Sequence, residues 1–296
     1  MLPGMPEQRS IKQASKPRIA IVGAGNLAGA LAVALHGAGY AIDEIVCRGR
    51  KESLQRARRL ASEVGAAAVT QARARLRAGV VWLCVPDGAI PTAAKSLSQA
   101  ADWKGKVALH ASGALTSDEL ADLRQRGAAV ASVHPLMTFV RGSRPPLVGV
   151  PFAIEGDAAA VRTARRIVKD LRGHAYPILK EDKAAYHAWG TFASPLLTAL
   201  LVTSEHVAAA AGIKPKAARQ RMLPMIRQTL ANYAVFGGAG AFSGPIVRGD
   251  LETVRKHLSV LRAIPEARDI YVALARAAQR DLPGKKRWAL KNVLNR

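Results

Sequence analysis

The sequence is poor in cysteine, in aromatic residues and in potential metal ligands. Only two of its 296 residues are cysteines, Cys47 and Cys84, which excludes a disulfide framework and favours a reducing compartment. Phe, Tyr and Trp make up 5% of the chain, too few for the aromatic platform on which single-stranded nucleic acids stack. No cysteines or histidines have the spacing of metal ligands, so we predict no metal site.

Long apolar runs are also missing, since no stretch of the sequence approaches the roughly 18 residues that a membrane-spanning helix needs. Residues 1–15 are polar and contain no apolar core of a signal peptide. We therefore expect a cytoplasmic protein without a membrane segment, which begins with a short disordered segment over residues 1–16.

Acidic residues are outnumbered by basic ones, 21 against 44, and the formal net charge is +23. Such a charge attracts anions, among them phosphorylated ligands, nucleic acids and acidic membranes. The arginines are dispersed along predicted helices, as in Arg56, Arg58 and Arg59. We interpret the charge as a solvated basic surface. A nucleic-acid-binding surface is the alternative, which the charge alone supports.

The most informative stretch is a glycine-rich turn between a predicted strand and a predicted helix. Residues 19–22 are apolar, as in a strand buried on both faces, and residues 27–35 are small and apolar. Between them lies the pattern G-x-G-x-x-A, which is typical of dinucleotide-binding turns in this context. We predict that the whole turn binds a dinucleotide, and its residues are Gly23, Ala24, Gly25, Asn26, Leu27 and Ala28.

Each small residue of this turn has a separate role in that prediction. Gly23 permits the tight turn, Gly25 lets a pyrophosphate approach the backbone, and Ala28 lets the helix lie close to the strand. The free N–H groups at the start of the helix attract the phosphates. The alternative is a tight turn of an α/β fold that binds nothing.

The end of the second predicted strand, residues 42–47, decides between the two nicotinamide coenzymes. Asp43 lies at the start of this strand, about 13 Å from its end, so we reject it as the ligand of the ribose hydroxyl. Arg48 follows the strand and can bind a 2′-phosphate through its guanidinium group. Arg50 and Lys51 are expected to help. We therefore favour NADP(H) over NAD(H), and the alternative for Arg48 is a surface arginine.

Strands and helices alternate over residues 17–180, which predicts a doubly wound, mostly parallel α/β sheet of the Rossmann type. Ligands bind at the carboxyl ends of such strands, so we expect Val85, Pro86 and Asp87 near the nicotinamide. Asp87 could equally cap a helix, and Ser117 is predicted to cap a helix over 118–126. The remaining strands are expected at residues 66–70, 80–85, 106–110, 130–134, 150–154 and 174–179.

No convincing strand follows Glu181, so we predict an all-helical second domain over residues 181–296. A long helix over 181–211 is expected to be disturbed at Pro195. Another is expected over 215–235, a third after the N-cap Asp250, and a fourth over 265–281. The basic tail, residues 285–296, is expected to be peripheral.

Several motifs occur in an order that resembles a known family of bacterial proteins. They are Val85-Pro86-Asp87, Ser112-Gly113-Ala114, HPL-x-x-F at residues 134–139, K-x-x-YH at 183–187 and GP-x-x-RGD at 244–250. Over residues 17–282 the chain resembles proteins that combine a Rossmann-like domain with the DUF2520 domain. These are similar to pyrroline-5-carboxylate reductase and to the 6-phosphogluconate dehydrogenase superfamily.

The resemblance implies a Rossmann domain, a dinucleotide in the cleft between the domains, and a helical C-terminal domain like that of 6-phosphogluconate dehydrogenase, which usually dimerises. It implies no particular substrate. The chain also departs from the family, whose members usually carry Asn at the position of Pro195. Related dehydrogenases pair a helical lysine with that amide near the substrate. Lys183 is retained, but Ser194 can replace only part of the missing amide.

A reductase needs a proton donor and an electrostatic clamp. Lys183 and His187 are four residues apart and share one helix face, so with Tyr186 they are candidates for the donor. The alternative is an exposed lysine and a packed histidine. His134 follows a strand and is placed to reach a ligand, unless loop backbone satisfies it.

Two further polar residues have two alternative roles each. Ser112 could bond the nicotinamide carboxamide or the substrate, or cap the next helix. Arg248 could clamp a substrate carboxylate, or pair with Asp250 or Glu252.

These observations favour an NADP(H)-dependent oxidoreductase that reduces a small anionic carbonyl or imine in the interdomain cleft and forms a homodimer through the helical domain. A dinucleotide-binding sensor or assembly protein without turnover is the alternative, and the missing Asn supports it. A basic nucleic-acid-associated protein is a third possibility, motivated only by the charge.

Overall fold

The structure is a computed structural model that describes residues 16–295. The chain divides into two compact units, Met1–Gly190 and Thr191–Arg296. Residues 1–15 of the predicted disordered segment lie outside the described residues. Lys16 donates a hydrogen bond to the carbonyl of Ala38 and forms an ion pair of 3.1 Å with Asp170.

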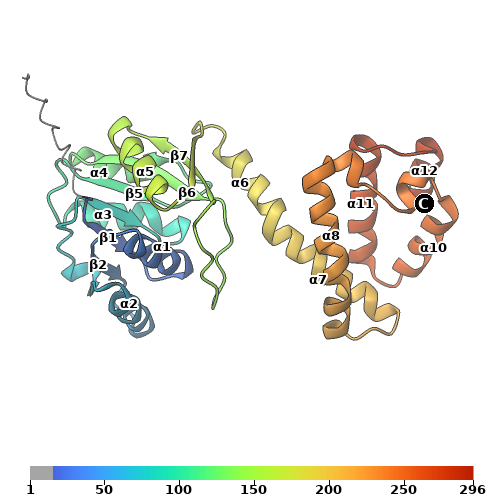
Figure 1. Ribbon diagram of the computed structural model, residues 1–296, viewed down its shortest axis with the longest axis horizontal. Coiled ribbons are helices and arrows are strands. Elements are labelled where there is room, and N and C mark those ends of the chain that lie inside the picture. Colours follow the sequence, from blue (N-terminus) through green and yellow to red (C-terminus); the bar gives the residue numbers. More distant parts are fainter. Residues whose placement is uncertain (1–15, 296) are drawn as a thin grey trace, which may run out of the picture. The chain divides into compact units, whose positions relative to one another are not determined.

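The first unit contains an eight-stranded sheet in the order β3-β2-β1-β4-β5-β6-β7-β8 (Figure 1). All neighbouring strands are parallel except β6 and β7, which are antiparallel. The prediction of a doubly wound, mostly parallel sheet is therefore confirmed. The strands are β1 (Ile19–Val22), β2 (Ile42–Cys47), β3 (Ala67–Thr70), β4 (Val80–Leu83), β5 (Val107–His110), β6 (Ala129–Pro135), β7 (Pro151–Gly156) and β8 (His174–Pro177).

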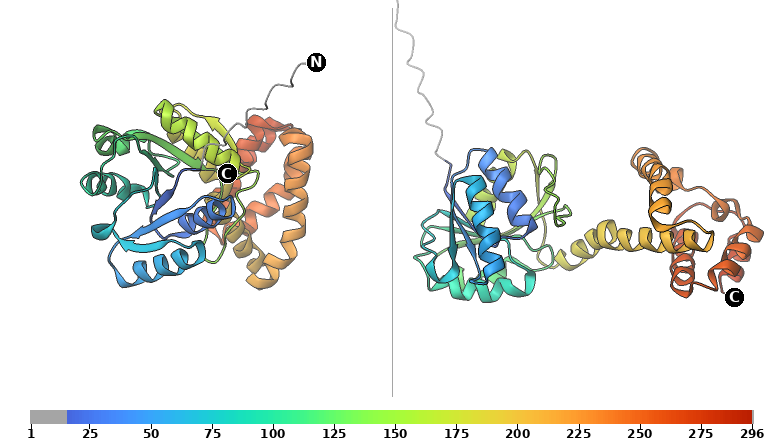
Figure 2. Two further views of the ribbon diagram at one scale, coloured as in Figure 1. Left: turned by 60° about the vertical axis from the view of Figure 1, so that its left-hand side comes forward. Right: turned by 90° about the horizontal axis from the view of Figure 1, so that it is seen from below.

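Helices cover both faces of this sheet (Figures 1 and 2). The strands are buried on both sides because alternate residues feed two cores: Ile19 and Ile21 face one, Ala20 and Val22 the other. The first core is completed by α1 (Asn26–Gly37), α2 (Lys51–Val64) and α5 (Ala158–Asp170). The second is completed by α3 (Ile90–Ser98) and α4 (Ala121–Gln125).

Two buried glutamates of the sheet hold loops in place. Glu44 in β2 accepts the backbone N–H groups of Arg75 and Leu76 at 3.1 and 2.9 Å. Glu155 in β7 accepts the N–H and the hydroxyl of Ser117 at 2.6 and 2.8 Å. A buried carboxylate is costly unless it is hydrogen-bonded, so each one fixes its loop.

The prediction that Ser117 caps the helix that follows it is wrong. Its hydroxyl is turned to Glu155, and the cap is Thr116, whose side chain accepts the N–H of Asp118. A 3-10 turn, Ser117–Leu120, precedes α4.

The described part of the second unit is all-helical, as predicted. Asp250 is the N-cap of its helix, because its carboxylate accepts the N–H of Thr253 at 3.2 Å. The helix Pro215–Ala241 is bent at Gly237, where φ is +66°. The helices are α7 (Leu197–Ala210), α8 (Pro215–Ala241), α9 (Pro245–Arg248), α10 (Leu251–Leu261), α11 (Pro265–Asp281) and α12 (Arg287–Leu294).

The basic tail of the chain is not peripheral, and that prediction is wrong. Residues 287–294 form α12, which buries Leu290, Val293 and Leu294 in the core of the second unit. The spacing of these three residues places them on one helix face. Its basic residues, Arg287 and Lys291, are exposed, which is why composition alone concealed the packing.

The long helix predicted over residues 181–211 is continuous but irregular. It consists of α6 (Lys183–Thr191), a π-helical turn (η4, Phe192–Leu196) and α7. Pro195 lies inside the π-helical turn. Because proline has no N–H to donate to the preceding turn, the regular α-helical hydrogen bonding is interrupted there. The predicted disturbance at Pro195 is confirmed.

The prediction that no apolar stretch reaches the length of a membrane span is wrong for this helix. Lys183–Ala210 has 28 residues, and its best window of 18 residues has a mean hydropathy of 1.2, with 6% of that window buried. By length and composition alone it could cross a membrane. A single helix of this kind is weak evidence for a membrane segment.

Candidate functional site

A cavity of about 520 Å³ lies at the carboxyl ends of β1, β2 and β4. It brings together six residues that the sequence marked as cofactor ligands, namely Gly23, Ala24, Gly25, Arg48, Val85 and Pro86. Five further polar residues line it, which are Ser53, Arg56, Gln71, Thr92 and Ser96. The edge of a parallel sheet at which strand order reverses is the usual place for a nucleotide.

The two glycines of the turn meet different constraints. Gly23 has φ +121°, and a Cβ there would lie 2.2 Å from the carbonyl oxygen of Cys84, so only glycine fits. A Cβ on Gly25 would meet nothing within 4 Å. Gly25 therefore borders open space next to its backbone.

The start of α1 has the features of an anion site. Gly25 is its N-cap and offers no side chain to the first turn, so N–H groups of this turn are left for a ligand. Ala28 is fully buried against the sheet, and Leu27 packs on the same core. Asn26 donates to the carbonyl of Phe139 at 3.2 Å. An open backbone and an uncapped helix start are what a pyrophosphate requires, so these residues fit a dinucleotide.

The basic residues after β2 divide into two groups. Arg48 lines the cavity, whereas Arg50 and Lys51 are exposed at the start of α2 and do not line it. Arg56, which was not predicted from the sequence, lies on the next turn of α2 and lines the cavity. Helical spacing could have indicated it, because Arg56 is three residues after Ser53, which also lines the cavity, and residues i and i+3 share a helix face.

Asp43 is held at the opposite end of its strand, where it forms an ion pair with Arg18. This agrees with its rejection as a ribose ligand.

Ser112 and Asp87 are bonded to each other. The Ser112 hydroxyl donates to the Asp87 carboxylate at 2.8 Å and accepts the N–H groups of Ala114 and Leu115 at 3.2 and 2.9 Å. Ser112 is buried, so these bonds fix the turn that follows β5. Asp87 makes no side-chain cap at the helical turn it begins; the bond from Ser112 occupies its carboxylate instead.

Lys183 is fully buried, and its ammonium group bonds to strand β6 and to the turn that follows β5. Its Nζ donates to Ser132 Oγ at 2.7 Å and to the carbonyl of Ser112 at 3.2 Å. Burial lowers the pKa of Lys183, against the opposing charges of Glu155 and Asp87. The lysine thus ties α6 to β6 and to the turn after β5. His187, expected on the same helix face, is exposed.

Two imidazoles meet beside Gly113. A Cβ on Gly113 would lie 2.8 Å from His134 Nε2 and 2.8 Å from His187 Cδ2. The two rings are 6.3 Å apart and edge to face. His134 Nδ1 lies 2.8 Å from the hydroxyl of Tyr186. Burial first, then the charges of Lys183 and His187, lower the pKa of His134 to about 4. This imidazole is therefore neutral at pH 7.

His110 lies beneath this cluster and is itself fully satisfied. Its Nδ1 accepts the N–H of Ser112 at 3.1 Å, and Nε2 lies 2.9 Å from the carbonyl of Thr116. Nε2 must therefore carry the proton. Burial lowers the pKa of His110 to about 4. Its role is to hold the turn that carries Ser112 and Gly113.

Arg248 belongs to the second unit, where it is the exposed last residue of α9. Hydrogen bonds from Thr253 lower the pKa of Asp250, and the charge of Arg248 adds to that effect. This electrostatic interaction supports the pairing alternative. The carboxylate clamp remains a prediction.

Two domain families match the sequence, one on each half. Residues 3–135 match the Rossmann-like domain, and residues 150–278 match DUF2520, a domain of unknown function. No curated protein matches the chain by sequence.

Solved structures share the fold over almost the whole chain. A candidate NADP oxidoreductase from Bacteroides fragilis is 22% identical, with a TM-score of 0.75 over 88% of this chain and 97% of that one. An imine reductase from Myxococcus stipitatus in complex with NADP+ is 17% identical, with a TM-score of 0.61 over 95% and 100%. A pyrroline-5-carboxylate reductase from Coxiella burnetii is 15% identical, with a TM-score of 0.56 over 94% and 99%.

At these identities the likeness establishes the fold alone. The two matched domains occur in the order that the motifs predicted, and between them they account for most of the sequence. The chain therefore joins a Rossmann-like domain to a DUF2520 domain.

Proposed function

We propose that this protein is an NADP(H)-dependent reductase that acts on a small anionic carbonyl or imine. The observation that carries the proposal is the cavity at the ends of β1, β2 and β4, which combines an open glycine turn with Arg48. The folds of an imine reductase and of a pyrroline-5-carboxylate reductase are similar to this one, which supports the class of reaction.

The residues of the glycine turn would hold the pyrophosphate, and Arg48 with Arg56 would hold the 2′-phosphate that distinguishes NADPH from NADH. A guanidinium group binds a phosphate through two parallel hydrogen bonds. When bound, the coenzyme supplies the hydride. The net charge of +23 attracts anionic substrates to the protein.

The proton that the substrate accepts on reduction would come from the two imidazoles beside Gly113, those of His134 and His187. Because Nδ1 of His134 is engaged by Tyr186, its Nε2 is the nitrogen left to face Gly113. His187 is exposed and can exchange protons with water. Lys183 and Ser112 are buried and bonded to backbone, so we assign them to positioning the turn rather than to contact with the substrate.

We also propose a homodimer formed through the helical unit. Large apolar side chains are exposed on α7 and α8, among them Val202, Met225, Leu230, Tyr233 and Phe236. Exposed apolar side chains in this number are typical of an interface. Phe236→Glu should shift the protein to monomer in light scattering.

A protein that binds the dinucleotide without turnover is the second candidate. Pro195 stands in the position of the family's usual Asn, inside a π-helical turn, and Lys183 is fully buried. Both features favour binding over chemistry.

One experiment separates the two candidates. NADPH and NADH are titrated against the purified protein by fluorescence, and NADPH oxidation is then measured with a panel of oxo acids and cyclic imines that carry a carboxylate. Binding with turnover supports the reductase, binding without turnover supports the second candidate, and no binding of either coenzyme refutes both.

A further inference from the structure

A second cavity, of about 1060 Å³, lies on the other side of the glycine turn. Its walls are the start of α1, one face of α2, and residues 141–144 of the segment that joins β6 to β7. We call residues 136–149 the strap. The second cavity shares Ala24, Gly25 and Arg56 with the first, so the two meet at the phosphate-binding turn.

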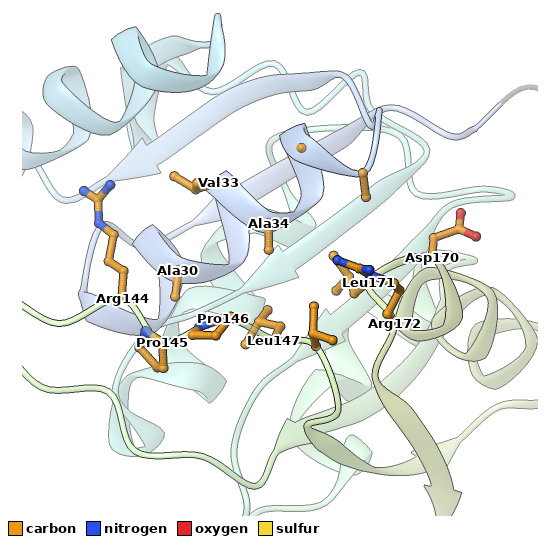
Figure 3. Close-up of a pocket in the computed structure, with 13 residues that line it drawn as sticks. Ala30, Val33, Ala34, Arg144, Pro145, Pro146, Leu147, Asp170, Leu171 and Arg172 are labelled. Carbon is orange, nitrogen blue, oxygen red and sulfur yellow. The ribbon is translucent and has the colours of Figure 1, made fainter.

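The strap is fastened across α1 at two points. At one, the Asn26 side chain donates to the carbonyl of Phe139. At the other, Arg144 Nη1 donates to both carboxylate oxygens of Glu63 in α2 at 2.7 Å. Beyond this point Pro145, Pro146 and Leu147 run along α1 and close a small cavity against it (Figure 3).

Arg141 lies between the two fastenings, in the wall of the second cavity. It is exposed, and its side chain has no hydrogen bond or ion pair within residues 16–295. The side chains of Arg56 and Arg59 on the α2 wall are likewise exposed and without such partners in this part of the chain. Glu63 is already paired with Arg144, so Glu52 is the remaining carboxylate of the lining.

Basic groups outnumber acidic ones around this cavity. Four guanidinium groups and the positive end of α1 face one cavity against two carboxylates. The two fastenings, at Asn26 and at Glu63, hold the part of the strap that carries Arg141 beside the start of α1. This excess of positive charge would attract a phosphate to the start of α1.

We infer that Arg141 is a second clamp on the dinucleotide, which binds its pyrophosphate from the side of the glycine turn opposite Arg48. The inference rests on the proposed function. The pyrophosphate is common to NADPH, NADH and ADP-ribose, so Arg141 contributes affinity without distinguishing the two coenzymes. Arg48 makes that distinction at the other end of the adenosine half.

The test compares Arg141→Gln with two other variants by measuring the Kd of NADPH, NADH and ADP-ribose. Arg58→Gln is the matched control, since Arg58 is an exposed arginine of α2 that lines neither cavity. We expect Arg141→Gln to raise all three Kd values by the same factor, about tenfold. Arg48→Ala should raise that of NADPH alone, and Arg58→Gln should change each by less than about twofold.

Each result has a defined meaning. If the unaltered protein binds the coenzymes and Arg141→Gln binds them equally well, the clamp is refuted and the proposed function stands. An effect on NADPH alone would place Arg141 at the 2′-phosphate and also refute the clamp. If the unaltered protein binds neither coenzyme nor ADP-ribose, both proposals fail. Because Arg141 lies on an exposed part of the strap, we expect the variants to have equal melting temperatures. That result would exclude misfolding as the cause of a change in Kd.

Discussion

The hydroxyl of Tyr186 lies 2.8 Å from Nδ1 of His134, although the two residues are 52 positions apart in the chain. Their rings are 5.5 Å apart and nearly perpendicular. The contact fastens α6 to the end of β6 and fixes which imidazole nitrogen faces Gly113. Burial raises the pKa of Tyr186 far above its usual range, so the phenol keeps its proton at neutral pH.

Removal of this hydroxyl should impair turnover more than binding. In Tyr186→Phe the ring of His134 loses the bond that orients it, and Nδ1 is left without its partner. We expect kcat for NADPH oxidation to fall at least about tenfold and the free energy of unfolding to fall by about 1 to 2 kcal/mol. The Kd of NADPH should not change.

The second unit contains a matched control for this variant. Tyr271 lies 3.2 Å from Nδ1 of His257 in the same kind of contact, remote in sequence from the predicted cofactor residues. Tyr271→Phe should leave kcat unchanged. A Tyr186→Phe protein with full activity would remove the His134–Tyr186 pair from the mechanism.

Two alanine substitutions in the glycine turn should have opposite consequences. In Gly25→Ala the new methyl group meets no protein atom within 4 Å, so the melting temperature should be retained while the affinity for both coenzymes falls at least about tenfold. In Gly23→Ala the methyl group would collide with the carbonyl of Cys84 at a φ of +121°. That protein should be destabilised by several kcal/mol, on the order of 3. Thermal denaturation and coenzyme titration separate the two outcomes, and normal coenzyme binding by Gly25→Ala would contradict the site.

The fold could be predicted from the sequence because its signals are local. The apolar run at β4 and the glycine turn before α1 each specify structure within a few residues, and Asp250 specifies the start of α10. The burial of α12 could not be predicted in this way. Whether a basic segment of eight residues packs or stays peripheral depends on a partner face, here formed in part by Val254 and Val272.

The candidate site shows the same limit. Arg48 was found from the end of a strand, but Arg56 lines the cavity only because α2 presents that face to the turn. The spacing of Lys183 and His187 predicts one helix face, yet one side chain is buried and the other exposed. Helical periodicity does not specify which edge of a face meets the core. Similarly, the hydroxyl of Ser112 was satisfied by Asp87, a residue 25 positions away.

The coenzyme preference depends on Arg48. Arg48→Ala removes the guanidinium group from the cavity, so the Kd of NADPH should rise about 10- to 100-fold while that of NADH changes little. Fluorescence titration of both coenzymes measures this. Arg50→Ala is the control, because Arg50 lies outside the lining of the cavity. An equal loss of affinity for both coenzymes would refute the assignment of Arg48 to the 2′-phosphate.

Stability of the first unit should decrease as the pH falls from about 6.5 to 4. His110 is buried as a neutral ring with a pKa of about 4, against an ordinary value of 6.5. Between these values the unfolded chain binds a proton that the folded chain does not, and protons therefore favour unfolding. For a shift of this size the free energy of unfolding falls by about 3 kcal/mol at pH 4, and His134 adds to the loss in the same direction.

Urea unfolding followed by the fluorescence of Trp82 and Trp103, both fully buried in this unit, measures the pH dependence. In His110→Gln the amide can replace both hydrogen bonds of the ring but does not titrate, so the slope between pH 6.5 and 4 should be reduced. His36→Gln, at an exposed position of α1, should keep the full slope. If His110→Gln lost stability by the same amount at every pH, the slope of stability against pH would be unchanged. The buried neutral imidazole would then not be the cause of the slope. The carboxylates of the first unit would have to account for the pH dependence instead.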